Sequence, residues 1–130
     1  MGSYLLDTHA LIFWVNKENI SNQFVSFLDE QNEMGNLYVS PISFWEIALL
    51  VKKGRIQLGD VTKWQSNVMD CSNIKLMNPG AGEMIESVNL PDLHKDPFDR
   101  LLIAQALNRN CLLVTKDETI NQYDVKTFWI

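Results

Sequence analysis

Short apolar runs alternate with longer segments of helical periodicity along this sequence, and that alternation restricts the fold more than any other feature. Each run has the length and composition of a buried strand. The expected strands are residues 3–6, 37–39, 74–77, 111–114 and an edge strand at 126–129. Strands that alternate with helices form parallel sheets with helices packed on the faces. We therefore expect an α/β domain with a mostly parallel central sheet flanked by helices on both faces.

Local signals mark where several of the expected helices begin. Ser21 and Asp60 are each placed to cap a helix with their side-chain oxygens. Asp96 is the predicted N-cap of a helix that begins at Pro97, because proline is favoured at the first helical position. The expected helices are 8–15, one after Ser21, 40–53, one after Asp60, 81–88 and 97–107, with a turn or short helix at 115–122.

The chain has the size and composition of one folded domain, spanning residues 1–130. Hydrophobic residues make up 46% of the sequence, which is enough for a core without disulfides or a structural metal. Cys71 and Cys111 stand in no disulfide framework and no zinc-binding spacing. The N-terminal segment lacks the basic region of a signal peptide and is interrupted by Asp7 and His9. We therefore expect a cytoplasmic protein without a membrane span.

The charge of the chain offers no direct sign of a nucleic-acid partner. A formal net charge of -5 and a sequence pI of about 4.9 give no basic footprint. Clustered carboxylates answer part of that objection, because acids held close together are stabilised when they coordinate a cation. Net charge is therefore a poor guide to the face that meets the substrate.

Four acidic residues, far apart in the sequence, are predicted to meet at one edge of the sheet. Asp7 ends the first strand, and Asp117 follows the fourth. Glu46 lies one or two turns into the helix after the second strand, and Asp99 lies in the first turn of the helix that begins at Pro97. Because the carboxyl ends of parallel strands share one edge of a sheet, we expect these side chains to converge.

Such a cluster predicts a metal site with hydrolytic chemistry. Oxygen ligands without a histidine or cysteine pair select hard cations, so Mg²⁺ or Mn²⁺ is the expected metal. The predicted ligands are Asp7, Glu46 and Asp99, with Asp117 bound directly or through water. A metal-activated water at this site suits hydrolysis of phosphodiester bonds, and no serine, cysteine or lysine stands in a recognisable nucleophile motif. The sequence therefore favours a metal-dependent nuclease.

Each acid also has a structural interpretation. Ser43 with Glu46, and Thr115 with Glu118, fit the capping-box pattern, and acids are common in first turns for dipole reasons alone. Asp96 is assigned to a helix cap, because the position before Pro97 favours Asp and its side chain can bond the Asp99 amide. Asp7 is the strongest site residue, because a carboxylate at the end of an apolar strand is costly to bury without a partner.

Other residues receive roles from the same reasoning. His9 and His94 have no partner pattern, so both are assigned to loop or core positions and left out of the catalytic set. Arg100, beside Asp99, is the candidate for a phosphate contact. Residues 10–15 are apolar on every side of their helix, which predicts either a partner surface or a fully buried helix.

The chain resembles the PIN-domain family, and within it the VapC toxins of bacterial toxin–antitoxin pairs. The resemblance is carried by LLDTHALIFW, SPISFWEIALLVKKGRI, LPDLHKDPFDRLLIAQA and LLVTKD, in that order, and covers nearly the whole chain. It implies a Rossmann-like sheet, Mg²⁺ or Mn²⁺ at the acidic centre, and endonucleolytic cleavage of RNA. Asp7, Glu46, Asp99 and Asp117 stand where the family has its acids, and Thr115 stands where it has a hydroxyl residue near the site.

The resemblance also implies protein partners. Similar toxins form homodimers and are silenced by a small VapB-like antitoxin that covers the early helices and the active-site groove. Two other functions stay open at this point: a receiver domain that accepts a phosphoryl group on one aspartate, and a PIN domain that binds its partner without catalysis. Stable labelling by acetyl phosphate distinguishes the first alternative, and the absence of RNA cleavage distinguishes the second.

Overall fold

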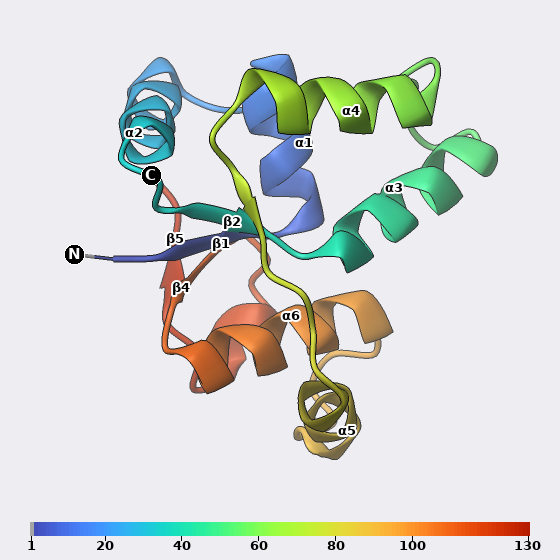
Figure 1. The fold of residues 1–130 in the computed structure, drawn as a ribbon. Helices are drawn as coiled ribbons and strands as arrows, with labels where there is room; N and C mark the ends of the chain where they lie inside the picture. Colours follow the sequence, from blue (N-terminus) through green and yellow to red (C-terminus); the bar gives the residue numbers. More distant parts are fainter. Residues whose placement is uncertain (1) are drawn as a thin grey trace.

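The strand order of the central sheet explains how the site is assembled (Figure 1). The computed structural model describes residues 2–130, in which five strands form one sheet in the order β3-β2-β1-β4-β5, and each neighbouring pair is parallel. The strands are β1 (Tyr4–Leu6), β2 (Leu37–Val39), β3 (Lys75–Leu76), β4 (Leu112–Val114) and β5 (Thr127–Phe128). The predicted parallel α/β sheet is confirmed.

Helices cover both faces of this sheet, as predicted. They are α1 (Thr8–Asn16), α2 (Asn22–Glu33), α3 (Pro41–Lys52), α4 (Val61–Cys71), α5 (Ala81–Asn89) and α6 (Pro97–Arg109), with a 3-10 turn at Ile120–Gln122. In Figure 1, α1, α2 and α4 lie above the sheet, and α5 and α6 lie below it. The predicted caps Ser21, Asp60 and Asp96 each accept a hydrogen bond from an amide of the helix they begin.

Leu5 and Leu6 show why the sheet is buried on both faces. Consecutive residues of a strand point to opposite faces, and both of these leucines are fully buried. Leu6 packs among apolar side chains from α1, α2, α3 and α4. Leu5 packs on the other face with Leu102 and Ile103 of α6. These two apolar layers give the site at the strand ends a rigid support.

The apolar helix α1 is covered by the chain itself. Its residues Ala10, Leu11, Ile12 and Trp14 are buried, and Phe13 and Val15 pack partly buried against the same core. The Trp14 indole N–H donates to Asp29 of α2 at 2.9 Å, and the Phe13 ring meets Trp129 edge to face. Most of residues 10–15 are therefore buried within the chain, and the partly exposed Phe13 and Val15 leave the predicted partner surface open.

The strand order also excludes the receiver alternative. Receiver domains have the sheet order 2-1-3-4-5, in which the third strand lies beside the first. Here β3 lies at the edge, beyond β2, and β1 pairs with β2 and β4. This is the order of the first five strands of a Rossmann sheet. Within residues 2–130, no helix combines the length and the apolar composition needed to cross a membrane.

Candidate active site

The register of the three central strands aligns the residues that follow them. Leu6 at the end of β1 lies opposite Val39 of β2 and Val114 of β4. The next residues after β1 and β4 are Asp7 and Thr115, and α3 begins directly after β2. The Asp7 amide donates to the carbonyl of Val114 at 3.1 Å. Asp7 therefore lies at the carboxyl ends of the parallel strands, as predicted.

Asp7 is a buried carboxylate that also caps a helix. Asp7 is only 7% exposed, and its Oδ1 accepts a hydrogen bond from the Ala10 amide of α1 at 2.8 Å. Burial raises the pKa of Asp7, although hydrogen bonds from Thr115 and Ala10 oppose the shift. Thr115, 2% exposed, thus lies against the site as the resemblance implies. A buried carboxylate whose pKa is raised by burial fits a place beside a cation.

Glu46 reaches the same edge from the second turn of α3. The Thr8 hydroxyl donates to Glu46 Oε1 at 2.6 Å, which ties α3 to the start of α1. Burial raises the pKa of Glu46, and the charges of Asp96 and Asp7 raise it further against the Thr8 hydrogen bond. The predicted capping box with Ser43 does not form, because α3 begins three residues earlier with Ser40 as its cap.

Asp99 experiences the combined charge of the cluster. It lies in the first turn of α6, and Asp96 caps that helix by accepting the Phe98 amide at 2.8 Å, as predicted. Burial, followed by the charges of Asp96, Asp7, Glu46 and Asp117, raises the pKa of Asp99 to about 8. The structure therefore brings together the four carboxylates that the sequence singled out.

Asp117 differs from the other three because both of its oxygens have partners. Oδ1 accepts the amides of Thr119 and Ile120 at 2.8 and 3.2 Å, and Oδ2 lies 3.1 Å from His94 Nε2. Burial opposes ionisation, but the hydrogen bonds from His94, Ile120 and Thr119 outweigh it and lower the pKa of Asp117. Asp117 thus begins the short turn, and the capping box predicted at 115–118 does not form.

His94 lies inside the site, although its sequence context indicated only a loop or core position. Its Nε2 is 3.0 Å from Asp99 Oδ2 and 3.1 Å from Asp117 Oδ2. The ligand atoms of these three residues are close enough to surround one cation. One feature of the sequence could have predicted this role: His94 lies two residues before the helix cap Asp96, in the loop that leads to Asp99.

Arg100 is a buried residue whose hydrogen-bond donors are occupied within the chain. Its residue is only 9% exposed, and its guanidinium donates to the backbone carbonyls of Ser87, Val88, Leu90, Pro91 and His94. These contacts argue against the predicted phosphate contact by Arg100, because they engage its donors in holding the loop between α5 and α6. The sequence showed the charge but not the carbonyl groups that surround it.

A groove between α3 and α6 opens beside the acids. It has a volume of about 370 Å³ and is lined by Glu46, Leu49, Leu50, Lys53, Lys95, Asp96, Pro97 and Phe98. The Trp45 ring, in a residue 60% exposed, packs edge to face on Phe98 with ring centroids 5.5 Å apart. Two lysines and an exposed aromatic ring thus lie next to Glu46.

Fold and site together define an α/β domain with a carboxylate cluster at the carboxyl edge of a parallel sheet. The sequence model of the PIN-domain family matches residues 4–126, so the chain belongs to that family. It is similar to Ribonuclease VapC22 of Mycobacterium tuberculosis, with 28% identity over 126 residues that cover 95% of this chain and 93% of that protein.

Solved structures share the fold over the full length. The chain resembles VapBC2 from Rickettsia felis bound to a DNA fragment from its promoter, with a TM-score of 0.70, 19% identity and 98% of each chain covered. It also resembles DNA-bound VapBC from Salmonella typhimurium, with a TM-score of 0.68, 14% identity and 98% of each chain covered. At these identities the likeness shows the fold, which agrees with the Rossmann-like sheet.

Proposed function

We propose that this protein is a metal-dependent endoribonuclease that acts as the toxin of a toxin–antitoxin pair. The observation that carries the proposal is the convergence of four carboxylates. Burial of Asp99, followed by the charges of the neighbouring acids, raises the pKa of Asp99 to about 8. Buried acids that repel one another in this way are stabilised by a divalent cation. The similarity to a protein named Ribonuclease VapC22 supports the reaction class.

Asp7, Glu46 and Asp99 are the proposed ligands of Mg²⁺ or Mn²⁺. All three carry pKa values raised by burial, and the donor set consists of hard oxygens, which suits these ions. Asp117 already has hydrogen-bond partners on both oxygens, so we assign it a contact through water. A bound ion would polarise the phosphodiester and lower the pKa of a water molecule. One of the carboxylates would orient that water or accept its proton.

The groove between α3 and α6 is the proposed path of the RNA. Lys53 and Lys95 line it and supply the positive charge that the overall composition lacks. The exposed Trp45 ring is held by Phe98, which suits stacking against an unpaired base. These residues replace Arg100 as the candidate substrate contacts, and their charge and exposed ring support RNA binding next to Glu46 by an acidic protein.

A cleavage assay tests the proposed reaction. Purified protein is incubated with mixed RNA and Mn²⁺, beside a sample with EDTA and the Asp7→Asn variant. Cleavage that EDTA and Asp7→Asn both abolish is the expected result, since Asn keeps the shape of the side chain but removes its charge. Cleavage that persists in Asp7→Asn contradicts the site assignment. A folded wild-type protein that cleaves no RNA would favour the binding-only PIN domain.

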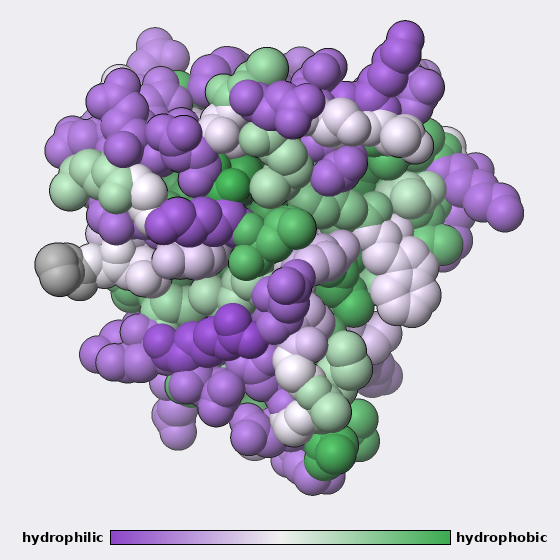
Figure 2. Space-filling view, in the orientation of Figure 1, coloured by the Kyte–Doolittle hydropathy of each residue, from purple (hydrophilic) through white to green (hydrophobic). Residues whose placement is uncertain are grey.

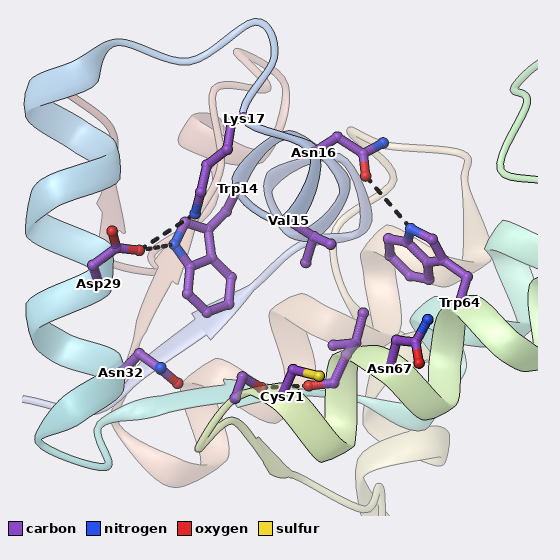
Figure 3. A pocket seen from close by; sticks show the side chains of 11 residues that line it. Trp14, Val15, Asn16, Lys17, Asp29, Asn32, Trp64, Asn67 and Cys71 are labelled. Carbon is purple, nitrogen blue, oxygen red and sulfur yellow. Dashed lines mark hydrogen bonds and ion pairs between the residues drawn. The ribbon is translucent and has the colours of Figure 1, made fainter.

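A small antitoxin is the proposed regulator, as in the VapBC complexes that this chain resembles. A hollow of about 490 Å³ lies where the end of α1 meets α2 and α4. Trp14 and Trp64 lie on either side of it (Figure 3). The Trp64 indole is held by Asn16 at 3.5 Å. We place an apolar segment of the antitoxin in this hollow. Co-expression of a neighbouring small reading frame, with Trp64→Ala as the variant that weakens the complex, tests the assignment.

A second copy of the chain is the other proposed partner. Met84, Ile85 and Val88 of α5 are 48%, 64% and 74% exposed, and Figure 2 shows apolar residues gathered at this end of the molecule. Exposed patches of this kind favour an interface. A dimer by light scattering that Val88→Glu converts to a monomer is the expected result, and a wild-type monomer would contradict it.

We place the proposed RNA cleavage in the cytoplasm, where RNA is available.

A further inference from the structure

His94 contacts two acids of the candidate site through one nitrogen. Nε2 lies 3.0 Å from Asp99 Oδ2 and 3.1 Å from Asp117 Oδ2, and the side chain is only 15% exposed. The other ring nitrogen, Nδ1, lies 3.1 Å from the backbone nitrogen of Asp96. Both nitrogens of this ring are therefore engaged, each with a different kind of partner.

The backbone amide of Asp96 fixes which nitrogen carries the hydrogen. A peptide N–H only donates, so Nδ1 must present its lone pair and the ring hydrogen must be on Nε2. The Nε2–H then points at two carboxylate oxygens, which are acceptors. In this tautomer Nε2 has no lone pair free for a metal, although its position beside two acids resembles that of a ligand.

We propose that His94 is a positioning residue of the metal site, whose Nε2–H holds the carboxylates of Asp99 and Asp117 in place while the acids alone bind the cation. The two acids come from different elements, the first turn of α6 and the loop after β4. A donor between them offsets their mutual repulsion and fixes their separation. This inference rests on the proposed metal-dependent function and assigns a role to a residue outside the four carboxylates.

Two substitutions separate the two ring nitrogens. His94→Gln places an amide N–H near the position of Nε2 and loses the acceptor for Asp96. His94→Asn keeps an acceptor near the position of Nδ1 and loses the donor to the carboxylates. Leu93→Ala, which changes an exposed side chain in the same loop, is the control. Thermal unfolding in EDTA checks that each variant is folded.

Mn²⁺ binding is measured by calorimetry without RNA. We expect His94→Asn to weaken binding by about 10-fold or more, as is typical when a residue that orients metal ligands is lost. His94→Gln and Leu93→Ala are expected to stay within about 3-fold of the wild type. Long-range proton–nitrogen NMR of the metal-free protein is expected to show hydrogen on Nε2 and none on Nδ1.

The opposite pattern would overturn the proposal. Retained binding in His94→Asn with loss in His94→Gln would make His94 a loop anchor for Asp96 only. Hydrogen on Nδ1 in the NMR spectrum, or equal loss in both variants, would fit direct metal ligation by Nε2. Because binding is measured without RNA, a wild-type protein that binds Mn²⁺ but cleaves no RNA refutes the proposed reaction and leaves the role of His94 decided by these variants.

Discussion

Replacing Asp99 by asparagine is expected to stabilise the metal-free protein while removing its metal binding. Asp99 is only 17% exposed and has a folded-state pKa of about 8, against 3.8 for the free side chain. At pH 7 it is therefore largely protonated in the folded protein and ionised in the unfolded chain. Between pH 3.8 and about 8, each pH unit lowers the free energy of unfolding by about 1.36 kcal/mol. The loss of stability caused by Asp99 at pH 7 is therefore at most roughly 4 kcal/mol.

The sign of this effect depends on pH. The folded-state pKa of Asp99 is raised, so its favourable contribution is fully present below about pH 4 and is lost as the pH rises towards about 8. Asparagine does not titrate. The advantage of Asp99→Asn should therefore be absent near pH 4, grow through neutral pH and level off near pH 8. We expect a gain of about 1–3 kcal/mol at pH 7, since the asparagine amide must also find acceptors.

Urea unfolding in EDTA across this pH range measures the difference. The exposed Asp70→Asn on α4 is the matched control and should stay within about 0.5 kcal/mol of the wild type at every pH. The reasoning is refuted if Asp99→Asn is less stable than the wild type at neutral pH. It is also refuted if the difference between the two proteins is the same at pH 4 and at pH 8.

Three further predictions follow from the same contacts. Arg100→Ala should cost more than about 3 kcal/mol in urea unfolding, because the backbone carbonyls it serves lose their donors; a cost below 1 kcal/mol would contradict its structural role. The apparent affinity for Mn²⁺ should fall about 10-fold per unit as the pH drops below about 8, because the cation displaces the Asp99 proton; calorimetry that shows no dependence on pH would refute this. Asp96→Ala should cost about 1 kcal/mol through loss of the cap on α6, whereas Asp96→Asn should cost little; equal losses in thermal unfolding would argue against capping.

Local sequence signals predicted the elements well because caps and strand ends depend on neighbouring residues. Ser21, Asp60 and Asp96 cap the helices that their positions indicated. The placement of Asp7 followed from the same logic, since it ends an apolar strand in a parallel sheet. The convergence of the four acids was predictable because parallel strands must deliver their carboxyl ends to one edge.

Contacts between distant segments were not predictable in this way. Glu46 fits a capping box in the sequence, but α3 begins earlier, at Pro41. The Glu46 side chain is therefore free to accept a hydrogen bond from the Thr8 hydroxyl. Arg100 donates hydrogen bonds to backbone carbonyls at the end of α5 and in the loop that follows it. His94 meets Asp117 across 23 positions of sequence. Each of these roles depends on tertiary packing, which no pattern of neighbouring residues reports.

Locating the cation by anomalous diffraction from crystals grown with Mn²⁺ tests the central claim most directly. We expect a manganese peak within bonding distance of oxygens from Asp7, Glu46 and Asp99, with Asp117 reaching it through water and His94 outside its ligands. A manganese ion held by His94 Nε2, or no manganese at these acids in crystals of the folded wild-type protein, would contradict the claim that these carboxylates form the metal centre.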